Sequence, residues 1–296
     1  MGQRSPRLRV AHFHDDARKR LSEAVETYID RASELHKTDT ESGHRAMLPW
    51  LERGLALAPA DRKVLAQLVH VLQWLREDAR LLPVLDDLSR RVSSQSLTLD
   101  FYRSETHRRI GERDLAFAGF ERTVAATGGR WPPALVGRAW VLYMRYDDAG
   151  ALADVERALQ LEPAAEPADA ARRIKGLVLL RRGDTDGATA EEATQARNSV
   201  HSIHRLHLRL RLELAAGRTD DALATAQAIA SAARSRDGIL AAALARAAAG
   251  RWSEVKTLLD PVARAGRAMP DRDFLLQTLG RALLEAGDRA AARARF

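Results

Sequence analysis

The stretch "AGRTDDAL" (Ala216–Leu223) has the composition of a turn between two helices, with a glycine that can end one helix and polar residues that can begin the next. Five other stretches share this character: IGERDLAF (110–117), RYDDAGAL (145–152), RGDTDGAT (182–189), AGRWSEVK (249–256) and AGDRAAAR (286–293). The residues that open the six turns are Gly111, Tyr146, Gly183, Gly217, Gly250 and Gly287. Successive turns are 35, 37, 34, 33 and 37 residues apart, so the sequence is built from a unit of about 34 residues.

The segments between the turns carry apolar residues at helical spacing, as in RKVLAQLVHVLQWL (62–75), ALVGRAWVLYM (134–144) and DFLLQTLGRALLEAG (273–287). No segment has the alternation expected of a strand. The sequence therefore predicts an all-α protein in which each repeat is a helix, a turn and a second helix.

This pattern resembles the tetratricopeptide (TPR) repeat, a 34-residue unit with an A-x3-F pair and a terminal proline. Ala116 with Phe120, and Ala292 with Phe296, match the A-x3-F pair, and RGLALAP (53–59) and RALQLEP (157–163) match the terminal proline. No single repeat carries the whole pattern. The resemblance implies a right-handed α-α superhelix, a TPR-like solenoid of about seven to eight repeats.

The spacing places approximate repeat starts at Tyr28, Lys63, Leu97, Pro132, Asp169, Ile203, Arg236 and Asp273. Residues 1–27 then form an N-terminal segment and the start of the first helix, which Asp15 or Asp16 is expected to cap. Residues 28–296 form one repeat array with an incomplete last repeat. The residues AAEPADAA (164–171) are expected to lengthen the turn between the fourth and fifth repeats.

Composition narrows the classes of function. The 296 residues contain no cysteine, which excludes disulfides and thiolate zinc sites, and no apolar run approaches the roughly 20 residues of a membrane span. We therefore expect a soluble, cytoplasmic protein without a membrane partner. The net charge of +7 is compatible with an acidic partner or nucleic acid, and 42 of the 47 basic residues are arginine.

The common signatures of enzymes are absent from the sequence. It contains no G-x4-G-K-[ST], G-x-G-x-x-G, G-x-S-x-G or H-E-x-x-H motif. The sequence thus predicts a protein that is not an enzyme and has no cofactor.

The resemblance implies a concave groove lined by the first helices of the repeats, at their second, fifth, ninth and twelfth positions. These positions, with one adjacent arginine, give an aromatic and cationic set of candidate ligand-binding residues: Trp74, Phe101, Arg108, Arg109, Trp140, Tyr143, Arg173, His204, His207 and Arg211. Aromatic residues and arginine dominate the binding energy of many interfaces. This composition favours a peptide or protein ligand with acidic groups.

Three histidines, His201, His204 and His207, follow one another at three-residue spacing. On a helix such steps fan across about 120°, which disfavours convergence on one metal ion. The repeat register places His201 in a turn and the other two in the groove, as a cationic and pH-sensitive part of it.

We therefore expect a non-catalytic TPR scaffold that binds a peptide or partner protein, either alone or as the recruiting domain of a larger enzyme such as a glycosyl- or sulfotransferase. RNA or another polyanion in the groove is the alternative, and a metal-dependent enzyme using His204 and His207 is a weaker one. The array stops at Phe296 without a polar capping helix, which predicts either a longer native chain or a homodimer through the open end.

Overall fold

The computed structural model describes residues 6–37, 40–59, 61–75, 77–91, 96–198, 202–232 and 236–264, together with 279–280, 283–284 and 292. Within these residues every regular element is an α-helix. The helices are α1 (Pro6–His36), α2 (Glu41–Leu57), α3 (Arg62–Trp74), α4 (Asp78–Arg91), α5 (Leu97–Arg109), α6 (Arg113–Ala126), α7 (Pro132–Met144), α8 (Asp148–Gln160), α9 (Ala165–Arg181), α10 (Thr185–Asn198), α11 (Ile203–Ala215), α12 (Thr219–Ala232), α13 (Arg236–Ala248) and α14 (Trp252–Arg264). The all-α prediction is confirmed, and none of the described helices is long and apolar enough to cross a membrane.

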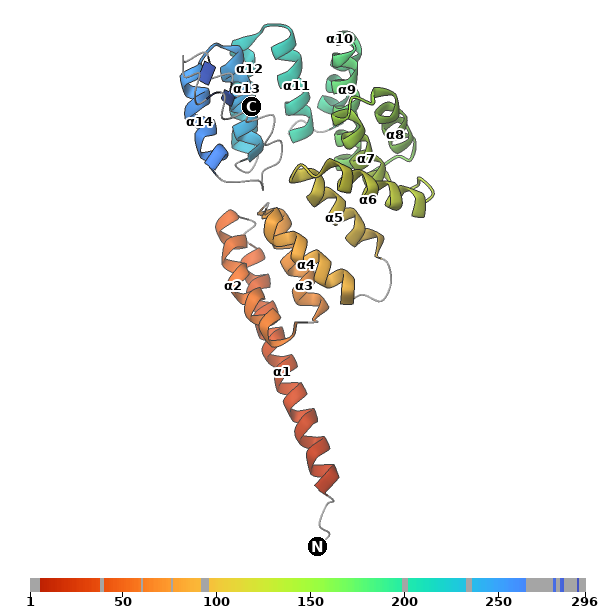
Figure 1. Cartoon of the computed structure of the whole chain (residues 1–296), viewed down its shortest axis with the longest axis vertical. Helices are drawn as coiled ribbons and strands as arrows, with labels where there is room; N and C mark the ends of the chain where they lie inside the picture. The colour runs from red at the N-terminus through yellow and green to blue at the C-terminus, as the bar shows by residue number, and fades with distance from the viewer. Residues whose placement is uncertain are drawn as a thin grey trace. The chain divides into compact units, whose positions relative to one another are not determined.

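The chain divides into two compact units, residues 1–99 and 100–296. In the first unit α1 packs against α2, α2 against α3, and α3 against α4. In the second unit successive helices from α6 to α14 lie side by side (Figure 1). The candidate residue Trp74 belongs to the first unit, and the other candidates belong to the second.

Four of the eight predicted repeat starts coincide with the start of a helix, and Asp273 lies outside the described residues. The helices α5, α7, α11 and α13 begin at the four predicted starts Leu97, Pro132, Ile203 and Arg236. The long N-terminal helix is also confirmed, because α1 runs without a break through Tyr28. The predicted cap is wrong: α1 already begins at Pro6, so Asp15 and Asp16 lie inside the helix rather than at its N-terminus.

The turns explain why the period is visible in the sequence. Gly111, Gly183, Gly217 and Gly250 have φ between 70° and 88°, a left-handed conformation that glycine adopts without strain. In each turn the next amide donates to the carbonyl five residues back, as from Asp184 N to Leu179 O at 2.9 Å. This hydrogen bond is the mark of a Schellman motif, which ends a helix at a fixed residue.

Tyr146 occupies the same place in the fourth repeat and has a φ of 63°. The amide of Asp147 donates to Leu142 O at 3.0 Å, so the Schellman motif forms here without glycine. A tyrosine in this conformation carries steric strain that glycine avoids.

Small residues allow close packing between neighbouring helices. A Cβ atom on Gly176 would overlap the side chain of Leu208, and one on Gly137 would overlap the ring of Phe120. Phe120 and Ala116 are fully buried, in agreement with their match to the A-x3-F pair. These contacts form the apolar layers between α6 and α7 and between α9 and α11.

The expectation of a lengthened turn after the fourth repeat is wrong. Residues 165–171 are helical and extend α9 by about one turn at its N-terminus. Pro167 is the third residue of α9, where its missing N–H has no partner within the helix, so proline does not break it. The amide of Ala168 donates to Ala164 O at 3.1 Å and closes this extra turn.

Candidate functional site

The first helices of successive repeats form a continuous row in the second unit. The helix α7 packs against α9, α9 against α11, and α11 against α13. This row is the surface on which the sequence register places the candidate ligand-binding residues. The open end predicted at Phe296, and His201, lie outside the described residues.

Trp140, on α7, is half-buried and packs against the apolar clusters that join α7, α9 and α11. The Cζ atom of Arg173, from α9, lies 4.8 Å from the centroid of the Trp140 ring. The Cζ atom of Arg108, from α5, lies 5.8 Å from it. Both arginines are within the range of cation–π attraction, so two repeats direct positive charge at one indole ring.

The arginines at the end of α5 are held by Glu105. Arg108 Nη2 donates to Glu105 Oε2 at 2.9 Å, one helical turn away. Arg109 is only 7 % exposed and donates to Thr106 Oγ1 at 3.3 Å. Arg109 is therefore buried and hydrogen-bonded within α5, whereas the guanidinium group of Arg108 reaches the Trp140 ring.

Tyr143 adds a second aromatic ring, with its centroid 5.7 Å from that of Trp140. The Cζ atom of Arg181 lies 4.1 Å from the Tyr143 ring centroid and 5.0 Å from that of Tyr146. Arg181 also donates to the Tyr143 carbonyl at 3.0 Å and pairs with Asp148. Arg181 does not stand at any of the four helix positions that the resemblance assigns to the groove. It lies two residues before the turn glycine, as Arg109 does, and this position identifies it in the sequence.

His207 lies on α11 and is 7 % exposed. Burial lowers the pKa of His207 from 6.5 to about 2, with further lowering by electrostatic interaction with Arg173, His204 and Arg211. The prediction of a pH-sensitive groove is therefore wrong for His207, which stays neutral at physiological pH. The guanidinium groups of Arg173 and Arg211 therefore bring positive charge to the surroundings of the His207 ring.

Two candidates have other surroundings. Phe101 packs among aromatic residues, with ring centroids 5.0 Å from Trp131 and 5.9 Å from Phe120. His204 Nε2 lies 3.3 Å from Glu166 Oε1, a residue of the extra turn of α9. We call the remaining candidates apart from Arg109, together with Arg181, the Trp140 cluster: Arg108, Trp140, Tyr143, Arg173, Arg181, His207 and Arg211.

Trp74, in the first unit, stacks on His44. The ring centroids are 3.9 Å apart and the planes are inclined by 15°.

No protein-family model and no curated protein matches the sequence. Among solved structures, the chain is similar to the APC/C hetero-tetramer Cut9–Hcn1, with a TM-score of 0.54 and 12 % identity over 85 % of this chain and 48 % of that one. It is similar to the human IFIT1 dimer with PPP-AAAA, with a TM-score of 0.53 and 12 % identity over 92 % of this chain and 71 % of that one. A tetratricopeptide repeat protein from Parabacteroides merdae has a TM-score of 0.49 and 15 % identity, over 78 % of this chain and 89 % of that one.

At these identities the likeness concerns the fold alone. Together with the 34-residue register and the repeated turns, it shows that the chain has a TPR-like helical-repeat fold.

Proposed function

We propose that this protein is a non-catalytic scaffold whose Trp140 cluster binds an acidic segment of a partner protein. The observation that carries the proposal is the placement of Arg108 and Arg173 over the Trp140 ring. An aromatic ring beside guanidinium groups offers an apolar contact and charge-assisted hydrogen bonds at one place, which suits a peptide with both an apolar and an acidic side chain.

The charge of the cluster supports an acidic ligand over a basic one. The cluster contains the arginines Arg108, Arg173, Arg181 and Arg211; Arg108 pairs with Glu105 and Arg181 with Asp148. Arg173 and Arg211 each lower the pKa of His207 through their positive charge, so both act electrostatically at that ring. A carboxylate placed there would be attracted by both charges.

The row of first helices supports a preformed site. Trp140 and Tyr143 pack against Leu177 and Leu208, so their rings are held before a ligand arrives. Binding to rings that are already ordered costs less conformational entropy than binding to mobile ones.

The proposal is tested by selecting peptides from a displayed random library against the whole chain and measuring their affinity by fluorescence anisotropy. We expect the selected peptides to be acidic, and Trp140→Ala to weaken binding by at least about tenfold, a typical loss at an interface hot spot. Arg173→Ala with Arg211→Ala should weaken it further at low salt.

Trp50→Ala is the matched control, because Trp50 has Arg53 Cζ 5.2 Å from its ring centroid but lies on α2 in the first unit. Equal affinities of wild type and Trp140→Ala would contradict the proposal. Circular dichroism of each variant separates loss of binding from loss of folding.

RNA is the second candidate, favoured by the positive charge that Arg173 and Arg211 bring to the surroundings of His207 and by the RNA ligand of the IFIT1 structure, which shares the fold. A single-stranded 5′-triphosphate oligoadenylate is the probe. RNA binding through several phosphates should weaken steeply with salt, with a slope of log K against log salt of roughly −0.7 per phosphate contacted. If this RNA binds tightly, if the binding depends on Trp140, and if no peptide is selected from the library, then RNA and not a peptide is the ligand of the cluster.

A further inference from the structure

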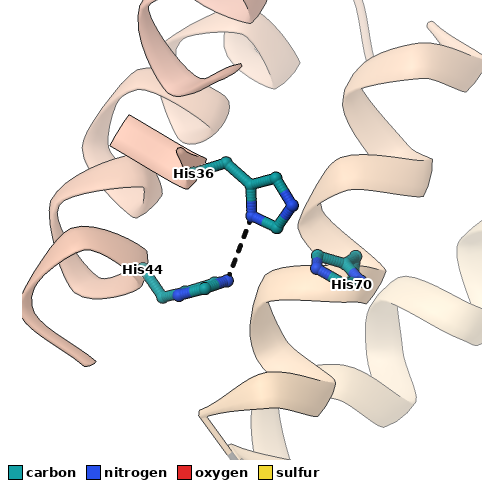
Figure 2. A group of neighbouring side chains, drawn as sticks. All are labelled: His36, His44 and His70. Carbon is teal, nitrogen blue, oxygen red and sulfur yellow. Dashed lines mark hydrogen bonds between the residues drawn. The ribbon is translucent and has the colours of Figure 1, made fainter. Parts of the chain in front are cut away.

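Three histidines outside the Trp140 cluster meet in the first unit. His36 is the last residue of α1, His44 lies in the first turn and a half of α2, and His70 lies on α3. Figure 2 shows the three imidazole rings converging from these helices. His36 and His70 are 34 residues apart, which is about the length of one repeat.

The rings are close enough to share one ligand. Their centroids are 5.1 Å apart for His36 and His44, and 5.0 Å apart for His36 and His70. His36 Nδ1 lies 3.2 Å from His44 Nε2, and one nitrogen atom from each ring lies within 4.8 Å of the others (Figure 2).

The hydrogen bonds of His44 fix its tautomer. His44 Nδ1 lies 2.9 Å from the Thr40 carbonyl oxygen, which can only accept, so Nδ1 carries the proton. The lone pair of this neutral ring is then on Nε2, the atom that faces His36. A histidine that donates one ring N–H to a carbonyl and presents its other nitrogen is the usual arrangement of a metal ligand.

Packing holds His44 in this orientation. His44 is fully buried, and the Trp74 ring stacks on it with a centroid distance of 3.9 Å. His36 and His70 are exposed and so leave an approach from solvent. One rigid and two accessible imidazoles therefore surround the point where the three nitrogens converge.

The donor set selects a class of metal. Imidazole nitrogen suits zinc and the neighbouring divalent transition metals, whereas calcium and magnesium require oxygen ligands. Two nitrogens bound to one tetrahedral zinc ion are about 3.3 to 3.4 Å apart, given Zn–N bonds of about 2.0 to 2.1 Å. The pair His36 and His44 already meets this spacing at 3.2 Å, and His70 is on the exposed side, where its ring can approach.

We propose that His36, His44 and His70 together bind one divalent ion of the zinc class, with a fourth position left for water. Binding replaces the hydrogen bond between His36 and His44: His36 releases the proton on Nδ1 to solvent and takes one on Nε2, and both facing nitrogens bind the ion. The ion joins α1, α2 and α3 and so stabilises the first unit. This site is independent of the function proposed for the Trp140 cluster.

The test is equilibrium dialysis of the whole chain against zinc, followed by elemental analysis, with affinity measured by calorimetry. We expect one equivalent in wild type and a loss of at least about 100-fold in affinity in His36→Ala and in His70→Ala, since even outer-shell changes typically cost 10- to 100-fold. His107→Ala is the control, because His107 pairs with Glu112 at 2.6 Å in the second unit and should not affect binding.

Cobalt(II) gives a second readout. Wild type with cobalt bound should show the visible absorption of a tetrahedral cobalt site. The bound cobalt should also quench the fluorescence of Trp74, so the quenching should be smaller in Trp74→Phe. His70→Ala should show neither the absorption nor the quenching. Both alanine substitutions are at exposed positions, and far-ultraviolet circular dichroism confirms that each variant is folded. Wild type that binds no zinc, or wild-type affinity in either His36→Ala or His70→Ala, would overturn the proposal.

Discussion

Arg138 binds both carboxylate oxygens of Asp154, with Nε–Oδ2 and Nη2–Oδ1 distances of 2.7 Å each. The pair joins α7 to α8 within one repeat, and the side chain of Asp154 is 8 % exposed. The hydrogen bond to Asp154 raises the pKa of Arg138, so the arginine is charged at every accessible pH.

We predict that Asp154→Asn lowers the free energy of unfolding by about 2 to 3 kcal/mol, because it leaves the Arg138 charge without its counter-ion in a mostly buried place. Asp114→Asn is the control: Asp114 pairs with Arg145, but its side chain is 96 % exposed, so the loss should stay under about 1 kcal/mol. Urea unfolding of both variants measures the difference. Equal losses would mean that burial does not matter for these pairs.

The conformation of Tyr146 predicts a stabilising substitution. Tyr146→Gly relieves the strain of a φ of 63° in a side chain that is 80 % exposed, and should raise the free energy of unfolding by about 0.5 to 1 kcal/mol. Gly183→Ala, at the equivalent turn with a φ of 83°, should lower it by about 1 kcal/mol. Thermal unfolding of the two variants checks the opposite signs, and a destabilised Tyr146→Gly would show that the contact of Tyr146 with Arg181 outweighs the strain.

Burial of His207 predicts a loss of stability in acid. Its pKa of about 2 in the folded state lies below the value of about 6.5 in the unfolded chain, so as the pH falls the unfolded state takes up a proton first. The stability present above pH 6.5 is thus lost towards pH 2, at about 1.4 kcal/mol per pH unit. Between pH 7 and pH 5, wild type should lose about 2 kcal/mol more than His207→Gln, as measured by urea unfolding at each pH. Parallel curves for the two proteins would contradict the burial of this ring.

The close approach of Gly176 to Leu208 predicts a coupled pair of substitutions. Gly176→Ala should cost about 1 to 3 kcal/mol, because the added methyl group overlaps the Leu208 side chain. In a Leu208→Ala background the same change should cost much less, since space is then present. A double-mutant cycle of unfolding free energies measures this coupling, and additive effects would show that α9 and α11 can move apart.

The fold could be predicted because the turns impose a requirement on the backbone. A left-handed residue must end each first helix, and glycine at Gly111, Gly183, Gly217 and Gly250 records that requirement in the sequence. The extra turn of α9 was not predictable in this way, since Pro167 suggests a break unless it is known to lie in the first turn of a helix.

The candidate site was predictable only in part. The register selects Trp140 and Arg173, and the structure brings them together. The repeat register does not show which side chains are buried, so the neutral state of His207 could not be expected from the sequence. The histidine group was missed because His44 lies on a second helix, outside the groove rule, although the 34-residue interval between His36 and His70 was visible.

The contacts of Arg181 have a consequence for how the second unit unfolds. This one side chain on α9 reaches Tyr143 and Tyr146 of the preceding repeat. It also pairs with Asp148, which belongs to that preceding repeat as well. In a linear array, the free energy at each junction between neighbours determines how many repeats melt as one block. Arg181 concentrates such junction energy between the fourth and fifth repeats, so these two should melt together rather than fray one at a time.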